Sequence, residues 1–183
     1  MSFSSEIKEE LASADIRRTC CATAECSALS QCLASFSIKG RGEMLLRYAC
    51  PSPTIAKRLL KLFRVFSLKN IGIAIQEDRR FGGRRTTVLT LSGAEARKMM
   101  LKLHMLRREN GVLRYKQIPQ RVVRRICCQR AFIRGMFLGC GTVSAPEKGY
   151  HAEFRFRDPK KAEFFNRVLA LQNLNFAISK RKT

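Results

Sequence analysis

The sequence has little negative charge. Only 14 Asp and Glu residues stand against 36 Lys and Arg in 183 residues, which leaves a formal net charge of +22. Such a surface attracts polyanions, and clustered Lys and Arg bind DNA or RNA by releasing counterions from the phosphates. The composition therefore favours a nucleic acid or an acidic protein as partner, and no pattern in it indicates a small-molecule substrate.

Long apolar runs are also missing. A membrane-spanning helix needs about 20 consecutive apolar residues, and the chain has no such run, no basic amphipathic anchor and no lipidation motif. The first eleven residues include Glu6, Glu9 and Glu10 and lack an apolar stretch, so they do not resemble a secretory signal. We expect a cytoplasmic, nucleoid-associated protein that does not bind a membrane.

Patterns of metal ligands are scarce. The chain has two His, His104 and His151, and none of its eight Cys lies in a C-x-x-C spacing. Two adjacent Cys-Cys pairs occur, at residues 20–21 and 127–128. Because adjacent side chains on a helix point in different directions, such a pair does not easily ligate one ion. We expect reduced structural thiols, no metal site and no cofactor.

The two Cys-Cys pairs mark an internal repeat. A shift of 107 residues places the first pair on the second and also aligns Ser37 with Ser144. Each copy opens with a proline-free stretch typical of a buried helix, continues with an extended segment and then has a helix that begins at a proline. The predicted opening helices are 19–34 and 120–140, the extended segments 43–49 and 151–157, and the proline-led helices 53–66 and 159–171.

The first copy contains more elements than the second. It continues with a hairpin of strands 71–75 and 86–91 and with a helix over 92–107, whereas the second copy reaches only the extended residues 173–178. We therefore expect an α+β (mixed α/β) fold of two pseudo-symmetric repeats, each ordered helix, strand, strand, helix, strand, strand, with the second truncated. The expected division is a helical extension at 1–18, a first repeat at 19–107, a linker at 108–119 and a second repeat at 120–183.

The opening helices resemble the LAGLIDADG motif of homing endonucleases. Residues 133–143, Ile-Arg-Gly-Met-Phe-Leu-Gly-Cys-Gly-Thr-Val, are similar to the motif helix and its closing turn, and residues 28–37 form a weaker copy. In that family the two motif helices pack closely side by side, so the resemblance implies a contact through small residues. The small residues at this expected contact are Ala28, Ala34, Gly135 and Gly141.

A wider resemblance, to the bacterial WhiA family of degenerate LAGLIDADG proteins, covers essentially the whole chain. It is carried by residues 1–11, Met-Ser-Phe-Ser-Ser-Glu-Ile-Lys-Glu-Glu-Leu, by both Cys-Cys helices and by residues 146–151, Pro-Glu-Lys-Gly-Tyr-His. The resemblance implies a DNA-binding transcriptional regulator linked to sporulation and cell division. In that family a helix-turn-helix follows the completed second repeat, and because this sequence stops at Thr183 we expect that element to be absent.

Catalytic carboxylates are missing from the motif. A LAGLIDADG nuclease needs one acid at the end of each motif helix, because the paired carboxylates hold the divalent ions that activate water. Those positions are Leu33 and Cys140 here. Neither side chain offers the oxygen donor that Mg²⁺ prefers, so we expect a protein that is not an enzyme.

Basic residues supply the candidate contacts to DNA. In this fold the polar faces of the strands form a saddle over the groove, and a basic turn joins two strands of the first copy. The candidates for phosphate contacts are Arg79, Arg80, Arg84, Arg85, Lys148, Arg155, Arg157, Lys180 and Arg181. Taken one at a time these side chains are as consistent with a solvated face, but as a cluster they favour DNA.

A second group of basic residues lies at the start of the second opening helix. These residues either form a solvated flank of the helix or provide a docking site for an acidic partner. Its members are Arg121, Arg124, Arg125, Arg130 and Arg134. Three function classes follow: a DNA-binding regulator, an RNA-binding maturase-like protein, and a protein-interaction module acting in transcription or division. The first is favoured, because RNA binding by stacking needs exposed aromatics and the chain has no Trp.

Overall fold

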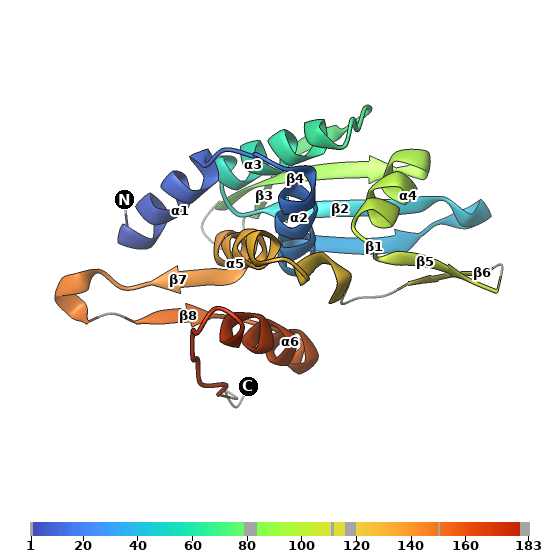
Figure 1. Ribbon diagram of the computed structural model, residues 1–183. Helices are drawn as coiled ribbons and strands as arrows, with labels where there is room; N and C mark the ends of the chain where they lie inside the picture. Colours follow the sequence, from blue (N-terminus) through green and yellow to red (C-terminus); the bar gives the residue numbers. More distant parts are fainter. Residues whose placement is uncertain (1, 79–83, 111, 116–119, 150, 180–183) are drawn as a thin grey trace.

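Two long helices, α2 (Thr19–Leu33) and α5 (Ile126–Cys140), lie side by side at the centre of the molecule (Figure 1). The computed structural model describes residues 2–78, 84–110, 112–115, 120–149 and 151–179. The two helices meet along their lengths, with Cys21 next to Cys127 near their starts and Cys32 next to Gly139 near their ends. The two helices therefore run in the same direction.

The first repeat builds a four-stranded antiparallel sheet. Its strands are β1 (Ala34–Ile38), β2 (Met44–Cys50), β3 (Gly72–Asp78) and β4 (Arg84–Ser92), in the order β1-β2-β4-β3. Side chains alternate between the two faces of a strand. Leu46, Tyr48 and Leu89 are fully buried on one face, beneath the helices. Ser35 and Arg47 lie on the other, exposed face, here called the open face.

Helices α3 (Pro53–Val65) and α4 (Gly93–Lys102) cover the buried face of the sheet. The Ser52 side chain caps α3 by accepting a hydrogen bond from the Ile55 amide, and Pro53 fits the first turn because no amide hydrogen is needed there. Leu59, Leu62 and Phe63 bury the apolar side of this helix. The proline-led helix predicted from the sequence is thus confirmed.

The second repeat is smaller in the described part of the chain. Strands β7 (Gly141–Val143) and β8 (Ala152–Phe154) form a two-stranded sheet, joined through the short helix η4 (Pro146–Lys148). Helix α6 (Pro159–Ala170) follows, with the Asp158 side chain as its cap. Phe154 and Phe165, with ring centroids 4.7 Å apart, tie this helix to the sheet. Within residues 171–179 the structure contains no strand.

The end of the first repeat differs from the helix predicted there, and the expected linker contains strand residues. The helix expected over 92–107 ends at Lys102, and the chain turns at His104, whose φ of 56° is left-handed. The segment expected as a linker holds the end of β5 (Leu106–Glu109) and all of β6 (Val112–Tyr115), which pair as a hairpin. Asn110, at φ 50°, starts the turn, because Asn tolerates this conformation well. Residues 116–119 of the expected linker lie outside the described residues.

The helix ends differ slightly from the prediction. Helix α5 begins at Ile126 rather than at residue 120, after the short helix η3 (Gln120–Val123). The N-terminal helix α1 (Phe3–Ser13) is capped by the Ser2 side chain, which accepts a hydrogen bond from the Ser5 amide. A further short helix, η1 (Gly40–Gly42), joins β1 to β2. Among the described helices none is long and apolar enough to cross a membrane.

Candidate nucleic-acid surface and motif-helix ends

The ends of α2 and α5 carry thiols and an apolar side chain. Leu33 is partly buried against the core of the first repeat, and Cys140 is partly buried beside Cys32. The hydrogen bond from Cys32 lowers the pKa of Cys140, and the same bond, with burial, raises the pKa of Cys32 well above its usual value. Residues 29–36 and 136–143 contain no Asp or Glu. These ends therefore offer soft sulfur donors, not the oxygen donors that Mg²⁺ requires.

Two lysines approach the same helix ends. The Lys8 ammonium lies 5.8 Å from the centre of the Phe137 ring, and burial lowers the pKa of Lys8. The Lys161 ammonium donates a hydrogen bond of 3.0 Å to the Gln31 carbonyl oxygen. A nuclease site would hold negative charge here, whereas this one holds positive charge.

Small residues set the close approach of α2 and α5. A Cβ atom on Gly135 would lie 2.5 Å from the Glu25 carbonyl oxygen and 2.8 Å from the Ala28 Cβ, and one on Gly139 would lie 2.6 Å from the Cys32 Cβ. Ala28 and Gly135 thus face each other. Gly139 is not among the predicted contact residues, although its spacing of four residues from Gly135 is a known pattern of close helix contacts.

The other two residues expected at this contact lie beyond the helices. Ala34 begins β1 and pairs with Tyr48, and Gly141 begins β7. A Cβ atom on Gly141 would collide with Phe137 of its own helix rather than with α2. These two positions lie one residue beyond the ends of α2 and α5, where the chain has already left each helix for the following strand.

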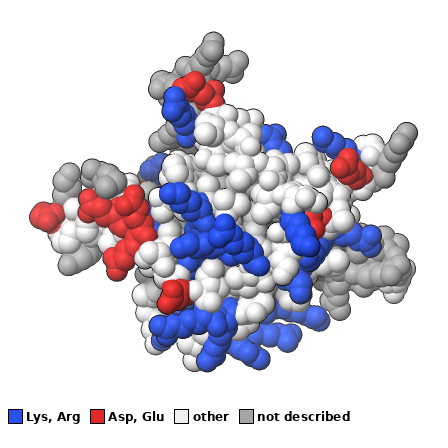
Figure 2. Space-filling view, turned by 90° about the horizontal axis from the view of Figure 1, so that it is seen from above, with Lys and Arg blue, Asp and Glu red and all other residues white. Residues whose placement is uncertain are grey.

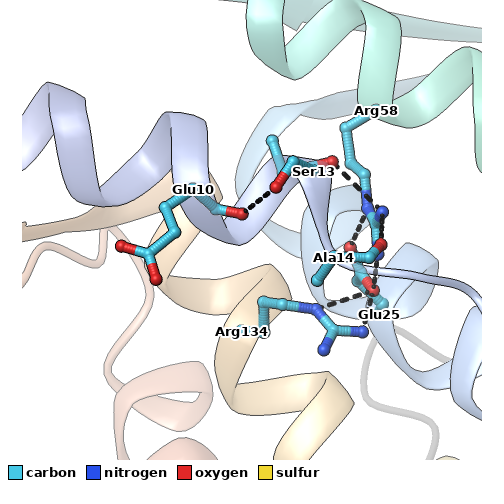
Figure 3. Close-up of polar contacts among 7 residues, drawn as sticks. Glu10, Ser13, Ala14, Glu25, Arg58 and Arg134 are labelled. Carbon is cyan, nitrogen blue, oxygen red and sulfur yellow. Dashed lines mark hydrogen bonds and ion pairs between the residues drawn. The ribbon is translucent and has the colours of Figure 1, made fainter.

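A buried ion-pair network joins four helices (Figure 3). The Glu25 carboxylate of α2 accepts hydrogen bonds of 2.6 and 2.8 Å from Arg58 of α3 and of 3.0 and 2.5 Å from Arg134 of α5. Arg58 also donates to the Ala12 and Ala14 carbonyl oxygens at the end of α1. Arg134 is therefore neither a solvated flank nor an open docking residue, the two roles that the sequence left for its group.

The basic residues predicted to bind phosphates are spread over several faces. Arg85 is exposed and lies 3.7 Å from Glu77, and the register places it on the same face of the sheet as Leu89, the face that the helices cover. Arg84 pairs with Asp78 in the backbone register, and Lys148 ends η4. The predicted residues Arg79, Arg80, Lys180 and Arg181 lie outside the described residues.

Arg155 and Arg157 follow β8 instead of lying within it. The predicted strand 151–157 ends at Phe154, since its partner strand β7 begins at Gly141. The Arg155 amide donates to the carbonyl oxygen of Cys140, the last residue of α5, at 3.2 Å. Both arginines are exposed and alternate with the partly buried Phe156, and Arg155 lies 3.5 Å from Glu153. The alternation of exposed and partly buried side chains therefore continues beyond the last residue of the strand.

Several exposed cations outside the predicted set lie on helices or on the open face. Lys57, Lys61 and Arg64 line the outer side of α3, and Arg47 lies on the open face between Leu46 and Tyr48. The strict alternation of apolar and polar residues in β2 could have identified Arg47. Figure 2 shows Lys and Arg gathered over the middle of one face, with Asp and Glu mainly at one end.

The cysteines at the starts of α2 and α5 are arranged differently from what the sequence led us to expect. The Sγ atoms of Cys20, Cys21, Cys127 and Cys128 all lie within 4.8 Å of one another. Within one helix an adjacent pair does not easily ligate one ion, but here two pairs from two helices converge. The tertiary structure brings the two pairs together, because the parallel helices begin side by side.

Solved structures with the same arrangement define the class of protein. The chain is similar to the crystal structure of I-DmoI in complex with DNA and Mn, with a TM-score of 0.59 and 15% identity over 90% of this chain and 85% of that one. It is also similar to the crystal structure of the N-terminal LAGLIDADG domain of DUF199/WhiA, with a TM-score of 0.72 and 20% identity over 99% of this chain and 80% of that one. The molecule has a LAGLIDADG fold.

Sequence comparison then gives the family. The family profile described as the WhiA LAGLIDADG-like domain matches residues 129–183. The Probable cell division protein WhiA of Heliobacterium modesticaldum is 31% identical over 182 residues, which span 100% of this chain and 57% of that relative. The chain is thus similar to the WhiA family along its whole length. It spans little more than half the length of this curated relative.

Proposed function

We propose that the chain is a DNA-binding domain of a transcriptional regulator and that it holds duplex DNA without cutting it. The observation that carries this proposal is the pairing of a LAGLIDADG fold, which I-DmoI uses in its complex with DNA, with motif-helix ends that present Leu33 and Cys140. Without carboxylates these ends do not hold the metal ions that cleavage needs. The chain therefore keeps the surface with which this fold contacts DNA but lacks the carboxylates that strand cleavage requires.

The charge of the chain supports the same proposal. A net charge of +22 favours binding to phosphates, and backbone contacts of this kind position a duplex without selecting its sequence. Arg47 on the open face and Arg155 and Arg157 beyond β8 supply such contacts in both repeats. The proposed partner is double-stranded DNA, and the proposed site of action is the nucleoid.

A second candidate rests on the position of the helix-borne charges. Lys57, Lys61 and Arg64 project from the outer side of α3, away from the open face of the sheet. A duplex seated on the open face does not reach them. They suit an acidic protein partner in transcription or division, which is the alternative function.

Binding of a labelled duplex of mixed sequence across a salt series, with Mg²⁺ present and strand cleavage followed in the same samples, tests the proposal. We expect affinity to fall steeply with salt and the strands to stay intact. Cleavage, or no binding at moderate salt, would contradict it.

A matched pair of variants separates the two surfaces. R47A/R157A removes two of the charges that we propose contact DNA, and K61A/R64A removes two from α3. If the proposed contacts bind phosphates, only R47A/R157A should flatten the plot of log affinity against log salt, by about 0.9 for each phosphate that is no longer neutralised. A reversed pattern would assign binding to the helix surface.

A further inference from the structure

We propose that Cys20, Cys21, Cys127 and Cys128 form a tetrathiolate zinc site that joins the two repeats at the starts of α2 and α5. Each pair occupies the first turn of its helix, at equivalent positions of the repeat. Neither helix supplies a complete ligand set by itself. The site therefore exists only when the two helices lie together.

The distances between the thiols suit this ion. In a tetrahedral site with Zn–S bonds of about 2.3 Å, the sulfur atoms lie about 3.8 Å apart. The Cys127 and Cys128 Sγ atoms are 3.9 Å apart, and all four Sγ atoms lie within 4.8 Å of one another. A contraction of about 1 Å or less, within reach of small side-chain rotations, gives tetrahedral geometry.

The donor set indicates zinc rather than a hard cation. All four candidate ligands are thiols, and soft thiolates select zinc over Mg²⁺ or Ca²⁺. Four protein ligands leave no open position for a reacting water, which is the pattern of a structural site and not of a catalytic one.

Electrostatics at the helix starts favour the thiolate form. Both helices direct their unpaired amides and the positive ends of their dipoles toward this point. Arg18 and Arg125 are the residues that cap the two helices, and neither caps with its side chain. A zinc ion with four thiolates carries a net charge of about −2, which these dipoles and cations stabilise.

A groove gives the ion access from solvent. Cys20 and Cys128 line one side of a hollow of about 630 Å³, whose other walls include Leu101 and Val122. The cluster is thus reachable after the chain has folded. It also lies at the opposite end of the two helices from Leu33 and Cys140, so it is separate from the proposed DNA-binding end.

Zinc at this site would hold the two repeats together. Its ligands come from positions 107 residues apart, so the ion closes a long loop and stabilises the contact between the repeats. It would fix how the two sheets are placed relative to each other, and therefore the shape of the surface that we propose to bind DNA.

Metal analysis of the 183-residue chain, purified under reducing conditions without chelator, tests the site. We expect about one zinc per chain, and replacement by Co²⁺ should give the visible bands of a tetrahedral tetrathiolate centre. C20S/C127S should lose both signals. C32S/C140S removes the other thiol pair that spans the same two helices, and it should keep them.

Thiol protection keeps the test decisive if C20S/C127S does not fold. In the unmodified chain, zinc should protect the four proposed ligands from alkylation, and a strong chelator should expose them and lower Tm. Peptide mapping that finds disulfides among these cysteines, iron with inorganic sulfide in place of zinc, or no metal and no protection would each overturn the proposal. DNA binding is measured separately, so failure of the zinc site and failure of the proposed function are distinguishable.

Discussion

Glu25 and Arg58 form a bidentate ion pair in the interior, with side chains that are each 1% exposed. The pair links α2 to α3, and through Arg134 it reaches α5 of the second repeat. A charge this deeply buried is tolerated only when it is paired and hydrogen-bonded. The pair therefore specifies how the helices of the two repeats are placed.

Replacement of Glu25 by Gln should destabilise the protein strongly. It leaves the buried Arg58 guanidinium without its counter-charge, and breaking a buried pair in this way costs about 3 to 5 kcal/mol. Urea unfolding followed by circular dichroism measures the change in the free energy of unfolding. Glu9→Gln, on the exposed side of α1, is the matched control and should change that free energy by less than about 0.5 kcal/mol. Equal effects of the two changes would contradict this role of Glu25.

The two arginines of the network should differ in importance. Arg58→Met leaves the Ala12 and Ala14 carbonyl oxygens without their donor and should cost about 3 to 5 kcal/mol. Arg134 is 23% exposed, so solvent screens its charge, and Arg134→Met should cost only about 1 to 2 kcal/mol. Chemical denaturation of both variants shows which change lowers the free energy of unfolding more. A larger destabilisation by the Arg134 change would show that the contact between the repeats dominates the network.

Gly135→Ala should weaken the contact between the motif helices. The added Cβ would lie 2.5 Å from the Glu25 carbonyl oxygen, so the helices must separate, at a cost of about 1 to 3 kcal/mol. Gly40→Ala is the control, because open space surrounds that position. Thermal unfolding should show a lower Tm for the first variant and an almost unchanged Tm for the second. An unchanged Tm in both would mean that α2 and α5 approach less closely than the structure describes.

Cys140 should react with iodoacetamide before Cys50. The hydrogen bond from Cys32 lowers the pKa of Cys140, whereas burial raises the pKa of Cys50 to about 12. At mildly alkaline pH a larger fraction of Cys140 is therefore thiolate, the form that attacks the reagent. Peptide mass spectrometry over a time course measures both rates. In Cys32→Ala the pKa of Cys140 should rise and its alkylation should slow; an unchanged rate would remove Cys32 as the cause.

Short-range patterns in the sequence predict much of the fold. The repeat of the Cys-Cys pairs, the proline-led helices and the missing acids at Leu33 and Cys140 are visible without coordinates, because periodicity, capping and turn chemistry act over a few residues. Glu25 is also visible as the only acid between residues 19 and 34, and it signals a buried partner. The sequence does not show that this partner is Arg58, which lies 33 residues away.

The tertiary structure decided which distant residues meet. Packing of α2 beside α5 brings Gly139 against Cys32, joins Arg134 to Glu25 and gathers the four thiols of Cys20, Cys21, Cys127 and Cys128. Each of these contacts spans about a hundred residues of chain, and local patterns carry no information on such distances. The alternation of residues in a strand shows that its faces differ, but only the sheet register and the helices that cover it decide which face is open.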